Sequence, residues 1–143
     1  MKKLLSFIFA MAFLLGLAGC ANKEMKVWDW AQSLTQADII SVTPWCHDTE
    51  RKELEPLNEA QILELVSLLN NLTKGSFTEN KDLVGITPTV GITVKTASET
   101  YHINYAPSPY GKYGMLEIGY NEKLWWIDNT ALLDFFESIT HRT

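Results

Sequence analysis

The sequence predicts an α+β domain in which helices pack on one face of a mostly antiparallel sheet of four to five strands. Three patterns predict this class. An apolar stripe with helical spacing lies between residues 58 and 75, period-two alternation marks strands between residues 90 and 127, and a second helical stripe follows from residue 129. With 143 residues, the chain has room for one domain.

The first part of the domain predicts a short helix and one strand. Residues 27–35 form the helix, with Trp28 and either Ala31 or Leu34 on one side. The β-rich run at residues 37–44 predicts the first strand, which proline stops at Pro44. Residues 45–57 show no regular period and carry several acidic side chains, so they are interpreted as a loop.

The first of the two main helices has the best-defined start in the chain. Asn58 is a candidate N-cap, and Gln61 stands three residues later in the capping-box position. Lys74-Gly75 is a typical helix end. The apolar stripe between these ends consists of Ile62, Leu65, Val66, Leu69 and Leu72.

Two hairpins and the second main helix complete the fold. Residues 90–94 and 101–105 alternate in polarity around a short connection at 97–99, and residues 116–120 and 124–127 do the same around Asn121-Glu122. Asp128 or Asn129 caps the last helix. Its apolar face consists of Leu132, Leu133, Phe136 and Ile139.

The N-terminal residues predict an export signal. Lys2 and Lys3 form a short positive segment, and a largely apolar stretch follows from Leu4 to Leu17. This stretch is shorter than the roughly 20 residues of a transmembrane helix and is typical of a signal peptide. It ends in Leu17-Ala18-Gly19-Cys20.

These four residues resemble the lipobox of bacterial lipoprotein signal peptides. The resemblance implies that the Cys20 thiol receives a diacylglycerol and that residues 1–19 are removed. Residues 20–26 would then be a lipidated tether, and residues 27–143 a single domain at the extracytoplasmic face of the cell membrane. An ordinary secretory signal and an uncleaved anchor are the alternatives.

The charge of the remaining chain excludes some partners. Removing residues 1–19 takes away two lysines and no acid, which leaves ten basic side chains against seventeen acidic ones, a net charge of about −7. Nucleic-acid binding is therefore not expected. The acidic domain also has no electrostatic affinity for an anionic bilayer, so the lipid must hold it there.

The pair Cys46-His47 is the one candidate for nucleophilic catalysis. Neighbouring residues of an extended segment point to opposite sides, so these two side chains are poorly placed to form a nucleophile–base pair, and His102 would have to replace His47. His47, Asp48 and Glu50 also contain metal-ligand types but lack the spacing of a zinc site. We therefore expect no catalytic residues, no metal and no cofactor. With Cys20 acylated, Cys46 has no disulfide partner.

Aromatic residues are the strongest indication of binding. All five tryptophans and all five tyrosines lie after residue 20. Tyr110 and Tyr113 stand among turn-forming residues at 107–114. Trp125 and Trp126 are neighbours on a strand, so one faces the helices and the other faces the outer side of the sheet. These four are candidate ligand contacts, because tyrosine and tryptophan offer large rigid surfaces.

The pattern of residues 37–137 is similar to that of small lipoproteins of unknown function from Gram-positive bacteria. The shared features are a first strand, a capped helix, two hairpins and a last strand rich in tryptophan. The resemblance implies a one-domain α+β lipoprotein and carries no active-site residue with it.

Three functions are therefore open. The first is a non-enzymatic binding module for an envelope protein, a peptide or a glycan. The second is an inhibitor or immunity-type protein that uses an acidic surface at Asp48, Glu50, Glu53 and Glu55. The third is a hydrolase built on Cys46 with His47 or His102.

Overall fold

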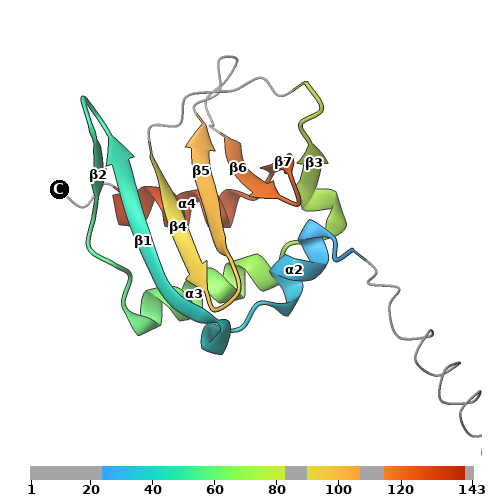
Figure 1. Cartoon of the computed structure of the whole chain (residues 1–143), viewed down its shortest axis with the longest axis horizontal. Coiled ribbons are helices and arrows are strands. Elements are labelled where there is room, and N and C mark those ends of the chain that lie inside the picture. Colours follow the sequence, from blue (N-terminus) through green and yellow to red (C-terminus); the bar gives the residue numbers. More distant parts are fainter. Residues whose placement is uncertain (1–23, 83–89, 107–114, 141–143) are drawn as a thin grey trace, which may run out of the picture.

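The computed structural model describes residues 24–82, 90–106 and 115–140, and these form an α+β domain with an antiparallel sheet (Figure 1). The predicted class is confirmed, but the predicted four to five strands are wrong, because the described residues form seven. In space the strands follow the order β2-β1-β4-β5-β6-β7-β3. The strands are β1 (Ile39–His47), β2 (Arg51–Glu53), β3 (Phe77–Glu79), β4 (Val90–Thr96), β5 (Thr100–Ala106), β6 (Met115–Tyr120) and β7 (Lys123–Ile127).

Three α-helices and two single turns of 3₁₀ helix accompany the sheet in the described residues. The helices are α2 (Val27–Ser33), α3 (Glu59–Asn70) and α4 (Thr130–Thr140), and the 3₁₀ turns are η1 (Gln36–Asp38) and η2 (Lys74–Ser76). In Figure 1, α3 and α4 lie behind the strands. We call this side of the sheet the covered face and the opposite side the outer face.

The hydrophobic core lies between the covered face and the helices. Successive side chains of a strand point to opposite faces, so every second residue enters the core. Leu65 and Leu69 of α3 and Leu132 and Phe136 of α4 are fully or almost fully buried against it. The strand residues of the core are Val42, Phe77, Ile92, Val94, Ile103, Leu116, Ile118 and Ile127.

The N-terminal capping signals of α3 and α4 operate as the sequence predicts, but the predicted helix end at Lys74-Gly75 is wrong, because α3 ends at Asn70 and these two residues lie in η2. The Asn58 side chain accepts a hydrogen bond from the Gln61 backbone N–H at 3.0 Å, and the Gln61 side chain accepts one from the Asn58 N–H at 3.0 Å. The Asn129 side chain accepts from the Leu132 N–H at 2.8 Å, so Asn129 rather than Asp128 caps α4. Asn121 and Glu122 adopt positive φ angles of 50° and 60° at the turn between β6 and β7.

The loop predicted for residues 45–57 is wrong in its first half. Strand β1 continues through His47, and β2 returns beside it to form a hairpin. Pro44 does not end the strand. Its carbonyl accepts from the Leu54 N–H at 2.8 Å on the side away from β4, and the missing proline N–H faces that same side. The pairing of β1 with β4 therefore loses no hydrogen bond.

Strand β3 was not expected, because three residues are too few to show a period. It pairs with β7 at one edge of the sheet, with Thr78 opposite Trp126. The backbone continues this pairing, since the Asn80 N–H donates to the Leu124 carbonyl at 2.9 Å. The contact joins segments more than forty residues apart, so no local pattern announces it.

Candidate functional site

A row of cross-strand partners crosses the outer face of the sheet. It runs through Trp45 on β1, Gly91 on β4, Asn104 on β5, Glu117 on β6, Trp126 on β7 and Thr78 on β3. Directly paired residues of antiparallel strands point to the same face. We call these six residues the central row. Its two tryptophans stand four strand spacings apart, about 19 Å.

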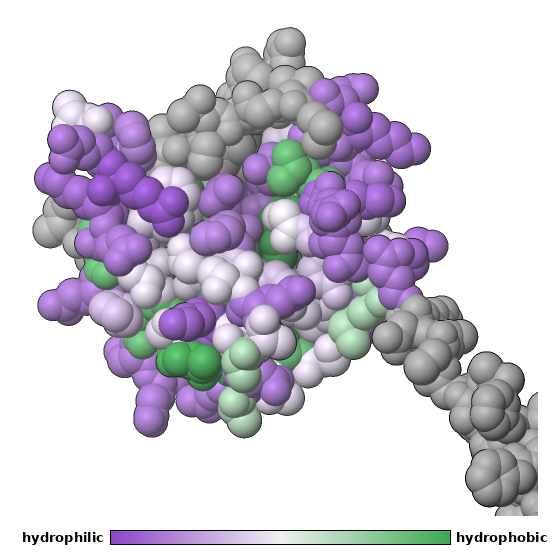
Figure 2. Space-filling model, in the orientation of Figure 1, coloured by the Kyte–Doolittle hydropathy of each residue, from purple (hydrophilic) through white to green (hydrophobic). Residues whose placement is uncertain are grey.

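Figure 2 views the outer face. Hydrophilic residues and residues of intermediate hydropathy cover most of it, and strongly apolar residues are few. The covered face is built mainly from Val, Ile, Leu and Phe. The outer face is therefore more polar than the covered face of the same strands.

Trp45 lies flat against the sheet at one end of the central row. A Cβ atom on Gly91 would come within 2.6–2.8 Å of three atoms of the Trp45 indole, so only glycine leaves room for this ring. The Arg51 guanidinium stacks over the ring, 4.5 Å from its centroid. Trp45 is only 5% exposed although it lies outside the core cluster.

Polar side chains next to Trp45 hold Arg51 in place. Arg51 Nη2 donates to the Thr93 hydroxyl at 3.5 Å, and Thr93 Oγ1 lies 3.3 Å from His102 Nδ1. Thr93 and His102 are themselves cross-strand partners on β4 and β5. This chain of contacts leaves Arg51 and His102 on the outer face, at the Trp45 end of the row.

Glu117 is the unusual residue of the central row. Only 8% of it is exposed, and its Oε2 has no hydrogen-bond partner in the described residues. Burial raises the pKa of the Glu117 carboxyl, and a hydrogen bond from the Asn104 side chain opposes this rise. The ion pair found in the described residues joins Lys123 to Glu79 at 3.4 Å and does not involve Glu117. Sequence reasoning missed Glu117, because its charge is ordinary for a strand whose outer face meets water.

The structure decides how Trp125 and Trp126 divide between the two faces. Trp125 packs against the core and meets Trp28 of α2 edge-on, with ring centroids 5.9 Å apart at an angle of 89°. Trp126 lies opposite Glu117 and Thr78 on the outer face and is half-buried. Of the predicted contact residues, Trp126 therefore belongs to the central row and Trp125 does not. Tyr110, Tyr113 and Cys20 lie outside the described residues.

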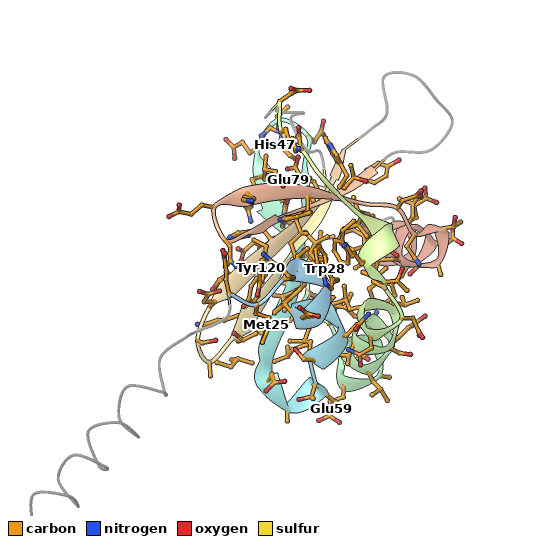
Figure 3. The ribbon with its side chains drawn as sticks, turned by 90° about the vertical axis from the view of Figure 1, so that its right-hand side faces the viewer. Met25, Trp28, His47, Glu59, Glu79 and Tyr120 are labelled. Atoms are coloured by element: carbon orange, nitrogen blue, oxygen red, sulfur yellow. The ribbon has the colours of Figure 1, made fainter. Side chains whose placement is uncertain are left out.

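Cys46 and the imidazoles of His47 and His102 lie on opposite faces. Cys46 pairs with Val90 on the covered face and is half-buried. His47 is exposed at the end of β1 and, like His102, belongs to the outer face. In the edge-on view of Figure 3, His47 lies at one end of the molecule and Glu59 at the other. Because both histidines face away from Cys46, neither is placed to act as a base for its thiol.

The described residues form neither a cluster of metal ligands nor a continuous acidic surface. Within them, no three His, Cys, Asp or Glu side chains gather closely enough to hold a metal ion. The β1–β2 hairpin places Asp48, Glu50 and Glu53 at the surface, but Arg51 and Lys52 stand between them. The hairpin is therefore not uniformly acidic.

A second group of aromatic side chains lies at the α2 end of the covered face. Trp30 packs on Tyr101 with centroids 4.5 Å apart, and Tyr101 stacks with Tyr120 at 6.1 Å. They border a hollow of about 410 Å³. Burial, followed by the effects of Glu99, raises the pKa of Tyr101 to about 12. Because these rings contact each other, we interpret the group as part of the packing between α2 and the sheet.

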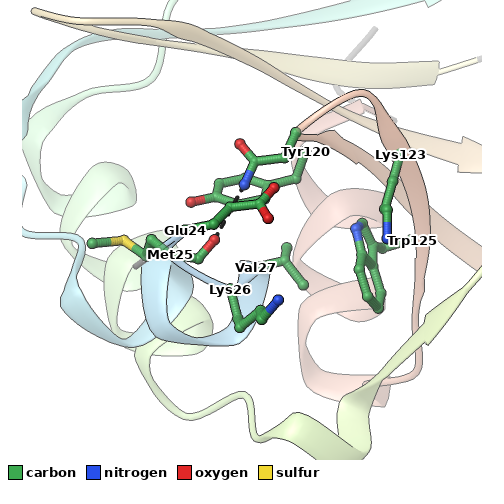
Figure 4. Close-up of a pocket in the computed structure, with 8 residues that line it drawn as sticks. Glu24, Met25, Lys26, Val27, Tyr120, Lys123 and Trp125 are labelled. Carbon is green, nitrogen blue, oxygen red and sulfur yellow. Dashed lines mark hydrogen bonds between the residues drawn. The ribbon is translucent and has the colours of Figure 1, made fainter. Parts of the chain in front are cut away.

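The start of the described chain is attached to the β6–β7 turn. A small hollow of about 30 Å³ lies between residues 24–27, Tyr120 at the end of β6 and Trp125 in the middle of β7. Figure 4 shows the side chains that line it. The Asn121 side chain donates to the Met25 carbonyl at 3.2 Å. Residues 24–26, which precede α2, therefore lie beside this turn.

Comparison with protein families, with characterised proteins and with solved structures finds no match for this chain. None of the helices in the described ranges has the length and apolar character needed to span a bilayer.

Proposed function

We propose that the protein is a lipid-anchored binding module that recognises a protein, peptide or glycan of the cell envelope on the outer face of its sheet. The observation that carries the proposal is the central row. It combines two tryptophans with a buried carboxyl group on the face that the helices leave uncovered. Polar groups buried without partners cost stability, so their presence favours a role in binding.

The lipid anchor rests on the lipobox at Leu17-Ala18-Gly19-Cys20. An acylated N-terminus supplies membrane affinity that the acidic domain lacks. Cys20→Ala in the full chain should move the protein from the membrane fraction to the soluble fraction and abolish incorporation of labelled fatty acid. Cys46→Ala is the matched control and should leave both unchanged. Fatty-acid labelling that persists in Cys20→Ala would contradict the anchor.

The binding face is tested by retention of the full chain on isolated cell-wall material and on immobilised envelope extract. Trp126→Ala should reduce retention at least tenfold, because aromatic anchors dominate such contacts. Trp28→Ala is the matched control, since Trp28 is also half-buried but packs on the covered face. Circular dichroism checks that both variants are folded. Equal retention of Trp126→Ala and the unmodified protein would rule out the outer face as the binding surface.

A further inference from the structure

Among the residues that the structure describes, no cationic side chain pairs with the carboxyl group of Glu117, although this group is buried on the outer face. Carboxylates are seldom buried so deeply unless they are paired. Glu117 Oε2 has no partner in the described part of the chain, and Asn104 supplies the hydrogen bond that opposes the rise in pKa. Arg51 is on the same face but is stacked on Trp45, three strands away. The described residues therefore supply no cation to this carboxyl group.

Among the described residues, the outer face is open at Gly119, near Glu117 on β6. Gly119 is two residues from Glu117 on β6 and faces the same side of the sheet. The nearest atom of the described residues to a Cβ placed on Gly119 is Leu124 Cδ2, 4.0 Å away. Gly119 is exposed, so a ligand can approach Glu117 along β6.

The neighbours of Glu117 complete the site. Asn104 and Trp126 are its cross-strand partners, one strand spacing away on either side. The Asn104 side chain carries a carbonyl oxygen as well as its donors, and the Trp126 ring offers a π-face that attracts cations. Glu117 Oε2 is itself buried, so we expect the half-buried Trp126 ring to turn when the ligand enters.

We infer that Glu117, Asn104 and Trp126 form a subsite for a primary ammonium group, and that the occupant is the lysine side chain of a peptide or protein partner. This inference rests on the proposed function of the outer face and names the chemistry of the ligand. An ammonium group neutralises the carboxylate, donates to Oε2 and packs on the indole.

Other ligand groups fit the subsite less well. A neutral hydroxyl would donate one hydrogen bond but leave the buried negative charge unneutralised. A guanidinium binds best when both oxygens of a carboxylate are free, and Asn104 already bonds this carboxyl group. The acidic chain, with a formal net charge of −5, adds a general attraction for cationic partners.

The experiment titrates the full chain, in detergent, with the capped tripeptide acetyl-Ala-Lys-Ala-amide and with the same peptide acetylated on the lysine Nε. Binding is followed by NMR shifts of the Trp126 indole N–H and by calorimetry. We expect the lysine peptide to bind at least tenfold more tightly than the acetylated one. Glu117→Gln should remove this preference while leaving the weak binding of the acetylated peptide unchanged.

Glu137→Gln is the matched control, because it makes the same substitution at an exposed position of α4 and should keep the preference. Equal binding of the two peptides, a preference that survives Glu117→Gln, or absence of binding would each overturn the inference. So would tighter Glu117-dependent binding of a glucosamine or N-acetylglucosamine oligomer. The proposed function fails on a different result, the unchanged retention of Trp126→Ala on envelope material.

Discussion

The two faces of the sheet use the same strands for different purposes. On the covered face, side chains such as Ile103 and Ile118 are completely buried against α3 and α4. On the outer face, Glu117 and the Trp45 indole are almost as deeply buried, yet each has a polar atom without a partner in the described residues. Trp125 on the covered face also has a buried indole N–H without a partner in the described residues, so the two faces differ chiefly in the buried carboxyl group of Glu117, which lies on the outer face. Such a difference is expected when one face binds a ligand.

The largest effect should come from removing volume at the covered face. Leu65→Ala on α3 should lower the free energy of unfolding by about 2–5 kcal/mol, because it leaves a cavity in the core. Leu65 is fully buried, whereas Leu63 on the same helix is 58% exposed. Leu63→Ala is therefore the matched control and should change stability by less than about 0.5 kcal/mol. Both values come from chemical denaturation, and similar losses in the two variants would disprove the assignment of the core face.

A smaller effect is expected from filling space on the outer face. Gly91→Ala should cost about 1–3 kcal/mol, because the new methyl group displaces the Trp45 ring from the sheet and from Arg51. Gly119→Ala makes the same change on the same face, where the nearest described atom is 4.0 Å away. It should be neutral or stabilising by up to about 1 kcal/mol. Thermal unfolding separates the two, and a neutral Gly91→Ala would show that Trp45 does not need glycine beneath it.

The third prediction concerns how stability depends on pH. Burial raises the pKa of Glu117 above its ordinary value of 4.5, so the folded protein retains this proton to higher pH than the unfolded chain does. The free energy of unfolding should therefore decrease as pH rises from that ordinary value through the pKa of the folded state. Glu117→Gln should remove this decrease, because the neutral amide has no charged form for burial to penalise.

Urea unfolding of the unmodified protein and of Glu117→Gln across this pH range measures the effect. Glu137→Gln again serves as the control, since an exposed carboxyl should leave the slope unchanged. Parallel pH profiles for the unmodified protein and Glu117→Gln would mean that the carboxyl is not penalised by burial.

The smallest effect belongs to the covered face and appears at alkaline pH. The pKa of Tyr101 is raised to about 12, first by burial and then by Glu99. The stability associated with its protonated form should be complete below the ordinary tyrosine pKa of 10.0 and be lost as pH rises through about 12. An ultraviolet absorbance titration should show a late ionisation step that Tyr101→Phe reduces, the remainder belonging to Tyr120, whose pKa is also raised by burial. An early, single tyrosine step would contradict the packing of this group.

Local patterns predicted the elements whose stabilising contacts are close in sequence. Asn58 with Gln61 marked the start of α3, Asn129 was one of two candidate caps of α4, and Asn121-Glu122 marked a hairpin turn. Each depends on hydrogen bonds or angles within a few residues. Strands β2 and β3 escaped prediction because they are three residues long and obtain their hydrogen bonds from partner strands.

The candidate site was also predictable only in part, because it depends on contacts between strands that are far apart in the sequence. Alternation along β7 required Trp125 and Trp126 to face opposite sides, but only the pairing of β7 with β6 and β3 assigned Trp126 to the outer face. Neither the burial of Glu117 nor the role of Gly91 beneath Trp45 has a local signature. Both arise from neighbours on other strands.

The sequence by itself determined the α+β class, the caps and turns and the expectation of a lipidated Cys20, since each depends on periodicity or on a short motif. The tertiary structure decided the seven-stranded order, the continuation of β1 through Pro44 and the assembly of the central row. The physical reason is that hydrogen bonds between strands, and the burial they impose on side chains such as Glu117, join residues far apart in the chain.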